Sequence, residues 1–187
     1  MKIGTGVGTM FTIGTPVDEQ VRGMMLVAKT AEEAGFHSVG LGHHILADSV
    51  SVLQCIPVMA ALATELKKMP LFFSQSVLPL YHPVDLAEQL VTLDAITGGR
   101  LVVGLLLGYR DIEFQALGLE KRHRAERFTE SFSILQKLLE GQSVDHEGRH
   151  FHLKGIQLHN RPVQKPRPLL LIGAYSDQAI RRAARIG

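Results

Sequence analysis

Residues 71–107, LFFSQSVLPLYHPVDLAEQLVTLDAITGGRLVVGLLL, contain a helical segment between two short apolar runs. The two runs, residues 71–78 and 101–107, have the length and composition of strands buried inside a protein. Between them, His82-Pro83 begins a predicted helix, because proline is favoured in the first helical turn, and Gly98-Gly99 ends it. A strand, a helix and a second strand of this size form the unit from which parallel sheets are built.

The same alternation extends over the rest of the chain. Further strands are predicted at residues 2–7, Ser38–Leu41 and Leu169–Ile172. Further helices are predicted from Thr15 as N-cap and Pro16 to Gly35, over residues 53–66 and 122–140, and after Ser176. Apolar strands separated by helices indicate an α/β protein whose parallel sheet is covered on both faces.

The fourth and fifth predicted strands lie farther apart in the sequence than the others. The extra residues, 141–168, alternate in polarity around 144–146 and 150–153, with Glu147-Gly148 at the turn. This pattern predicts a β-hairpin insertion, followed by an extended segment interrupted by prolines. No repeat or linker marks a second domain, so residues 1–187 are expected to form a single domain with an insertion at 141–168.

The composition excludes several classes of partner. Lys and Arg total 20 against 18 Asp and Glu, so the charge gives no reason to expect nucleic-acid binding. No apolar run approaches the roughly 20 residues of a membrane helix, and the N-terminus has no signal-peptide pattern. Cys55, the single cysteine, lies among apolar residues and is predicted to be a core residue rather than a nucleophile. We therefore expect a cytoplasmic protein that binds no membrane.

Ligands of parallel α/β proteins bind in the loops at the carboxyl ends of the strands. The fifth such loop, Gly173-Ala174-Tyr175-Ser176, leads directly into a helix. Its small residues allow a ligand to approach the backbone, and the free N–H groups of the helix start attract an anion such as a cofactor phosphate. A tight turn with Ser176 as the helix cap explains the same residues equally well.

Two other strand ends carry candidate residues. His44 follows the second strand, where its ring could hydrogen-bond to a bound ligand or move a proton near neutral pH. Ser76 and Val77 end the third strand, where an apolar wall could support a flat aromatic ring. From position alone, a structural loop histidine and an ordinary buried strand end are the favoured interpretations.

Three histidines of the predicted hairpin are candidate metal ligands. His146, His150 and His152 lie close together in the sequence, but no carboxylate or cysteine pattern completes a recognised zinc spacing. We therefore predict no metal site and interpret these residues as part of an exposed hairpin.

Several segments together resemble the bacterial luciferase-like family of flavin- and deazaflavin-dependent oxidoreductases. The similar segments are residues 31–36, 78–89 (LPLYHPVDLAEQ), 92–94, 98–101, 108–111, 113–114, 147–151, 161–164 and 183–187. Their order and spacing over most of the chain carry the resemblance, and no single motif does.

The resemblance implies an eight-stranded (β/α) TIM-type barrel, here incomplete with about five strands, and FMN or a deazaflavin coenzyme of the 8-hydroxy-5-deazaflavin type as cofactor. His44 would match a histidine near the flavin ring. Ser76 and Val77 would match a strand end that often contains a non-prolyl cis peptide behind that ring. Leu106 replaces a glycine that is common in the family and would narrow the space beside the ring. The loop near the cofactor phosphate would consist of Gly173, Ala174, Tyr175 and Ser176.

The implied function is a flavin-dependent oxidoreductase or monooxygenase, acting on a small organic substrate, with His44 as the catalytic residue. With a deazaflavin the reaction would be hydride transfer. A flavin reductase and a homo- or heterodimer partner are also implied. The alternative is a non-catalytic barrel partner or a fragment without activity of its own, which the short length, Leu106, and His43 in place of a usual Glu or Gln support. A third possibility, a sugar-phosphate barrel enzyme, lacks paired carboxylates or a strand-end lysine.

Overall fold

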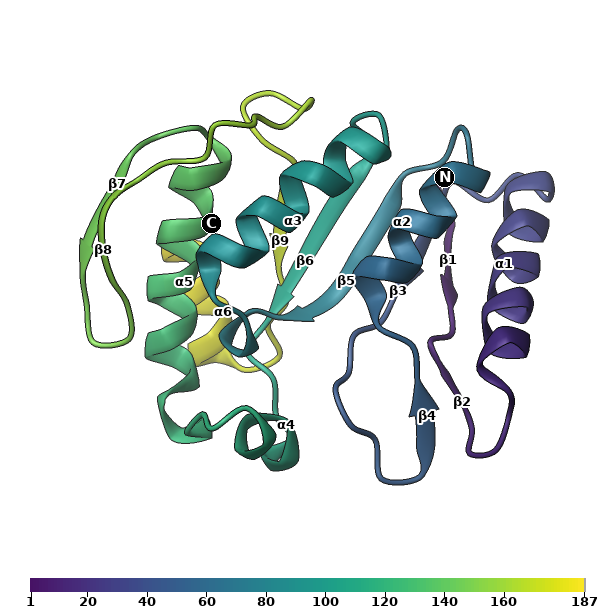
Figure 1. The fold of residues 1–187 in the computed structure, drawn as a ribbon, viewed down its shortest axis with the longest axis horizontal. Helices are drawn as coiled ribbons and strands as arrows, with labels where there is room; N and C mark the ends of the chain where they lie inside the picture. The colour runs from purple at the N-terminus through teal and green to yellow at the C-terminus, as the bar shows by residue number, and fades with distance from the viewer. Residues whose placement is uncertain (187) are drawn as a thin grey trace.

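The computed structural model describes residues 1–186 and contains a five-stranded parallel sheet. In spatial order the strands are β1 (Gly4–Val7), β3 (Ser38–Leu41), β5 (Leu71–Val77), β6 (Leu101–Leu106) and β9 (Leu169–Ile172). Every neighbouring pair is parallel, with Val39 opposite Leu71 and Leu71 opposite Leu101. All five carboxyl ends therefore lie at one edge of the sheet (Figure 1).

Helices connect the strands in a single winding direction. They are α1 (Val17–Glu33), α2 (Cys55–Glu65), α3 (Pro83–Ile96), α5 (Arg124–Leu139) and, after the last strand, α6 (Asp177–Ile186). The strand order follows the chain order without reversal, and right-handed crossovers then place the connecting helices on the same face of the sheet. In Figure 1, α2 and α3 cross in front of the strands, with α1 and α5 to either side. This winding is that of a (β/α) barrel rather than a doubly wound sheet.

The expectation that helices cover both faces of the sheet was wrong for the described residues. Residues along β6 alternate between buried and partly exposed, and on β9 Leu169 and Leu171 are 53% and 41% exposed. The strand sequences are nevertheless apolar on both faces, because the second face of such a sheet lines the interior when a barrel closes. One face is therefore the packed core and the other faces the barrel axis.

The core lies between the sheet and the helices. Val39, Phe73 and Val103 point from the strands to this side and are fully buried, and Leu90 of α3 and Leu135 of α5 are fully buried against them. Each such side chain contributes about 2 kcal/mol through burial of apolar surface. This packing fixes the strand ends on which a site can be built.

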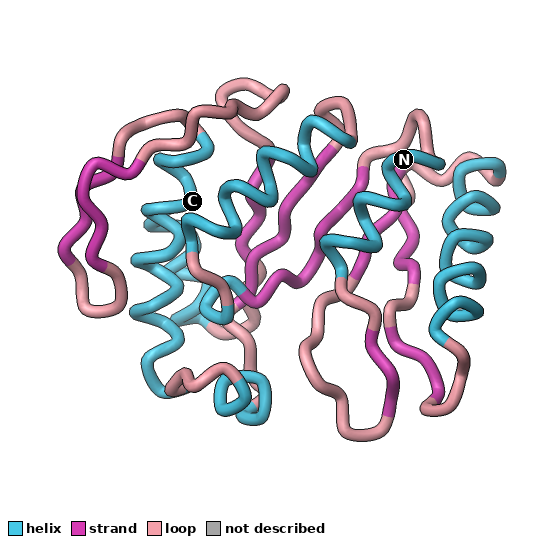
Figure 2. Tube along the Cα trace, viewed as in Figure 1, coloured by secondary structure: helices cyan, strands magenta, loops and turns pink. Residues whose placement is uncertain are grey.

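The insertion forms the predicted hairpin. Strands β7 (Val144–Glu147) and β8 (His152–Ile156), which follow β6 and precede β9 in the sequence, pair in antiparallel fashion as a separate two-stranded sheet (Figure 2). Glu130 of α5 accepts hydrogen bonds from the backbone N–H groups of Arg149 and His150, each at 3.1 Å. In the segment that follows the hairpin, Gln164 donates a hydrogen bond from its backbone N–H to the buried Asp94 carboxylate at 3.0 Å. The insertion is thus attached to α5 and α3 by specific contacts.

Some local predictions differ from the structure. The structure contains an antiparallel pair that the sequence did not predict, formed by β2 (Met10–Thr12) and β4 (Val50–Val52). The short helix α4 (Asp111–Ala116) and the 3-10 turns Leu78–Leu80 and Lys121–His123 were not predicted either. Pro16 rather than Thr15 occupies the N-cap of α1, without a side-chain hydrogen bond. None of the helices in the described part of the chain has the length and apolar character needed to cross a membrane.

Candidate functional site

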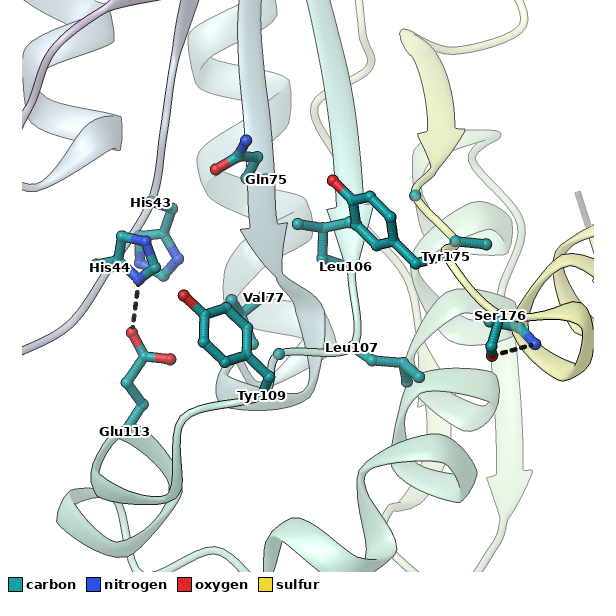
Figure 3. A pocket seen from close by; sticks show the side chains of 14 residues that line it. His43, His44, Gln75, Val77, Leu106, Leu107, Tyr109, Glu113, Tyr175 and Ser176 are labelled. Carbon is teal, nitrogen blue, oxygen red and sulfur yellow. Dashed lines mark hydrogen bonds and ion pairs between the residues drawn. The ribbon is translucent and has the colours of Figure 1, made fainter.

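The carboxyl ends of the strands surround a cavity of about 490 Å³. Its lining residues come from β5 and β6, from the loops after β3, β6 and β9, and from α4 and α6 (Figure 3). Seven of the eight site residues predicted from the sequence line it, namely His44, Val77, Leu106, Gly173, Ala174, Tyr175 and Ser176. His43, Gln75, Tyr109 and Glu113 complete the polar part of the lining. Residues 44, 77 and 175 therefore lie around one hollow, as their positions at strand ends require.

Ser76 is the predicted residue that the structure does not bring into the cavity. Its side chain is fully buried, and its Oγ has no hydrogen-bond partner among the described residues. The expected cis peptide is not found at Ser76–Val77 either, since the only cis bond in residues 1–186 joins Lys165 to Pro166. Instead, β5 is irregular one residue earlier: Gln75 has a φ of 65° and the β5–β6 register shifts there. The extra residue turns Gln75 toward the cavity and Ser76 toward the core.

Close backbone packing forms the floor of the cavity. Gly108 has a φ of 77°, and a Cβ added to it would lie 2.5 Å from Val77 Cγ1. Only glycine therefore fits this turn after β6. On the other side, a Cβ on Gly173 would collide with Cδ2 of Leu106. The Leu106 side chain thus lies against the backbone of Gly173, the residue that follows β9.

The end of the cavity nearest α6 is a helix start. Ser176 Oγ accepts the backbone N–H of Ala179 at 3.3 Å, so Ser176 caps the helix as predicted. The preceding residues, Gly173 and Ala174, line this end of the cavity, while Tyr175 is 96% exposed. Small residues and a helix N-terminus together favour an anionic group at this position.

A buried carboxylate orients the predicted catalytic histidine. Glu113 of α4 is 1% exposed, and its Oε1 lies 3.0 Å from His44 Nδ1 (Figure 3). The same oxygen accepts the backbone N–H of Ile45 at 3.2 Å and lies 3.6 Å from Arg110 Nη1. When Nδ1–H donates to this carboxylate, Nε2 of His44 is left as a proton acceptor. Glu113 was not predicted as a site residue, although it lies within a segment that resembles the family.

His43, which lines the cavity, and Cys55, which donates a hydrogen bond to the carbonyl of Gly42, are both buried and uncharged. Burial lowers the pKa of His43 to about 4, against a smaller opposing effect of the Glu113 charge. Burial raises the pKa of the Cys55 thiol to about 12, and Cys55 is 1% exposed. Cys55 is therefore a core thiol, as predicted, and not a nucleophile.

Two histidines of the hairpin contact carboxylates of neighbouring side chains. His146 Nε2 lies 3.3 Å from Glu130, and exposed His152 pairs with Glu147. Within residues 1–186, no group of three or more His, Cys, Asp or Glu side chains could hold a metal ion.

The lining is compatible with a flavin-type cofactor. The wall formed by Val77, Leu106 and Gly108 is apolar and suits a flat ring, and the backbone at Gly173 and Ala174 suits a phosphate. The walls around this space are closely packed, because a Cβ atom added to Gly108 or Gly173 would collide with the Val77 or the Leu106 side chain. Leu106 is the side chain that most restricts it.

Comparisons with known proteins agree with this architecture. The chain is 29% identical, over 89% of its length and 48% of the relative, to the uncharacterized protein y4vJ of Sinorhizobium fredii. The chain spans about half the length of the curated relatives that it matches. Among solved structures, the monooxygenase RslO1 of Streptomyces bottropensis superposes with a TM-score of 0.89 and 26% identity, over 99% of this chain and 57% of that one.

Two structures of known cofactor use share the fold. An F420-dependent secondary alcohol dehydrogenase matches with a TM-score of 0.83 and 20% identity, over 100% of this chain and 56% of that one. The oxygenating constituent of 3,6-diketocamphane monooxygenase from Pseudomonas putida, in complex with FMN, matches with a TM-score of 0.80 and 20% identity. This match covers 94% of this chain and 52% of that one. A sequence profile described as luciferase-like monooxygenase matches residues 1–187. The chain therefore belongs to the luciferase-like monooxygenase family.

Proposed function

We propose that this chain forms the cofactor-binding part of a flavin-dependent oxidoreductase or monooxygenase that acts on a small organic substrate. The observation that carries the proposal is the convergence of His44, the apolar strand ends and the start of α6 on one cavity. When bound, FMN would supply the redox chemistry, with its ring along Val77 and Leu106 and its phosphate at Ala174 and Ser176.

His44 is the proposed proton-transfer residue. Glu113 holds its Nδ1, so the ring is fixed with Nε2 available to take or give a proton in the cavity. The exposed fraction of the His44 side chain is 19%, which limits competition from water. Glu113 itself is a positioning residue in this proposal, because its contacts with His44 and Ile45 are already made.

A second candidate is hydride transfer with a deazaflavin coenzyme. The His44–Glu113 pair favours it, because oxidation of an alcohol needs a base to take the hydroxyl proton, and Nε2 of a histidine held in this way is suited to that task. The same cavity serves both candidates, since both cofactors have a flat ring and a phosphate-bearing chain.

The binding test compares FMN with riboflavin, which lacks the phosphate. We expect FMN to bind the wild-type chain at micromolar concentrations in a fluorescence titration, about tenfold more tightly than riboflavin. Ala174→Asp places a carboxylate at the proposed phosphate position and should remove this preference through charge repulsion. Ala34→Asp, on an exposed residue at the end of α1, is the matched control and should retain it.

The deazaflavin coenzyme is titrated in parallel. Tighter binding of this coenzyme than of FMN would favour hydride transfer over the monooxygenase reaction. If neither cofactor binds to the wild-type chain, the proposal fails and a non-catalytic barrel partner becomes the better description.

We further propose that the chain assembles as a dimer and receives reduced flavin from a separate reductase. The proposed dimer is supported by an apolar groove between α2 and α3, which is lined by Ile56, Ala60, Leu93 and Ile96 among others. Analytical ultracentrifugation checks it: a monomer at micromolar concentration would contradict the dimer.

A further inference from the structure

His43 is a second histidine at the cavity, and the proposed reaction does not use it. It follows β3, is 1% exposed and contributes to the cavity lining. The backbone just before it is fixed, because the carbonyl of Gly42 accepts hydrogen bonds from the Thr9 hydroxyl at 3.0 Å and from the Cys55 thiol. The ring of Phe73 packs edge-on against His43, with centroids 6.0 Å apart. The position of the His43 side chain is therefore determined by the fold.

Tyr81 determines which nitrogen of His43 carries the proton. The Tyr81 hydroxyl lies 3.0 Å from His43 Nε2, and burial raises the pKa of this phenol, so the hydroxyl keeps its proton. His43 Nε2 is the only partner found for that hydroxyl within residues 1–186. Because a buried O–H group needs an acceptor, the phenol donates to Nε2. The neutral imidazole then carries its own proton on Nδ1.

The structure also explains why Tyr81 is rigid enough for this role. Tyr81 follows the short turn Leu78–Leu80, and Arg127 of α5 donates to the carbonyl of Pro79 at 2.8 Å and to that of Tyr81 at 3.5 Å. The aromatic rings of Tyr81 and His43 are in contact, with centroids 5.4 Å apart. The hydrogen bond between Tyr81 and His43 is thus held in place by β3, by the β5–α3 connection and by α5.

The Nδ1–H group that results has no acceptor. His43 Nδ1 is one of the few buried polar atoms of residues 1–186 without a hydrogen-bond partner. Such orphaned donors are uncommon in folded proteins and call for an explanation. Since this ring is part of the cavity wall, the missing acceptor can come from a molecule bound in the cavity.

We propose that His43 donates a hydrogen bond from Nδ1 to a carbonyl oxygen of the ligand bound in this cavity, with Tyr81 as the residue that sets the tautomer. The inference rests on the proposed function for the existence of that ligand. The carbonyl belongs either to the cofactor ring, since flavins and deazaflavins both carry carbonyl groups, or to the substrate. Nδ1 is shielded from solvent in the free protein, so the contact requires a small rotation of the ring that keeps the hydrogen bond between Nε2 and Tyr81.

The tautomer is measured first, in the free protein, by ¹⁵N NMR of the histidine rings. Wild type should show the Nδ1–H form of His43. Tyr81→Phe keeps the aromatic packing but removes the hydroxyl, and should give a mixture of the two tautomers. An Nε2–H tautomer in the wild type would overturn the inference whether or not any cofactor binds.

A pair of amide substitutions then tests the ligand contact. In His43→Asn the side-chain amide lies near the position of Nδ1, and in His43→Gln near that of Nε2, so only the asparagine keeps a donor toward the ligand. If the carbonyl belongs to the cofactor, His43→Gln should weaken binding of FMN or the deazaflavin coenzyme by about tenfold. His43→Asn should remain within about threefold of wild type. Thermal unfolding of both variants confirms that each is folded.

Acetone, used as a carbonyl probe, distinguishes the substrate as the source. If the carbonyl belongs to the substrate, both variants bind the cofactor normally, and acetone shifts the His43 Nδ1 resonance in the cofactor-loaded wild type. Equal affinities in both variants together with an unmoved Nδ1 resonance would overturn the inference. Failure of the wild type to bind either cofactor would overturn the proposed function and the cofactor contact, while the tautomer measurement would still stand separately.

Discussion

Glu113→Ala is the substitution that most directly probes the architecture of the site. The buried carboxylate accepts hydrogen bonds from His44 Nδ1 at 3.0 Å and from the Ile45 N–H at 3.2 Å. A hydrogen bond to a charged group contributes about 1.5 kcal/mol or more, so losing two should lower the free energy of unfolding by about 3 kcal/mol. For a chain of this size, that corresponds to a decrease in Tm of about 6–12 °C.

Urea denaturation followed by circular dichroism measures this loss. Glu120→Ala is the control, because the Glu120 side chain is 60% exposed and its ion pair with Arg122 lies in solvent, where such pairs contribute little. Glu113→Ala should also reduce turnover, since His44 loses its orientation. If Glu113→Ala is as stable as Glu120→Ala, the carboxylate does not hold the His44 loop and this description of the site is wrong.

Three further outcomes are expected. Gly108→Ala should lower the free energy of unfolding by about 1–3 kcal/mol, because φ is 77° and the new Cβ would lie 2.5 Å from Val77 Cγ1; an unchanged urea midpoint would refute this. Leu106→Ala should tighten FMN binding several-fold by widening the cavity, as measured by fluorescence titration, and weaker binding would show that Leu106 supports the ring. Because the pKa of His43 is about 4 in the folded chain against 6.5 when unfolded, the unfolded chain binds more protons between these values. Stability should therefore be complete above pH 6.5 and fall by up to about 3 kcal/mol toward pH 4, and His43→Gln should show a smaller loss over this range.

The fold could be predicted in outline because its signals are local. Ser38–Leu41 and Leu169–Ile172 were predicted with the bounds that the structure shows, since each is a short apolar run between helix signals. The hairpin of residues 141–168 was also found from alternation alone. The strand pattern alone could not predict that helices cover one face only, because strands that line a barrel interior are as apolar as strands covered by helices. The (β/α) barrel was predicted from the family resemblance.

The site was only partly predictable, because its irregular parts depend on tertiary contacts. His44 and Glu113 are 69 residues apart in the sequence, and nothing local indicates that α4 brings them together. The turn of Gln75 into the cavity depends on a shifted β5–β6 register, which a simple alternation rule does not anticipate. For the same reason Ser76 was assigned to the cavity, although one extra residue in the strand directs it into the core.

In the proposed function, the edge of the sheet at the carboxyl ends of the strands binds the flat ring and the phosphate of a flavin-type cofactor. Mapping amide chemical-shift changes by NMR as FMN is added tests it most directly. We predict that the largest changes fall on Val77, Gly108, Ala174 and Ser176, which line one cavity. Changes confined to the opposite edge of the sheet, around the hollow lined by His37 and Lys68, would contradict the claim.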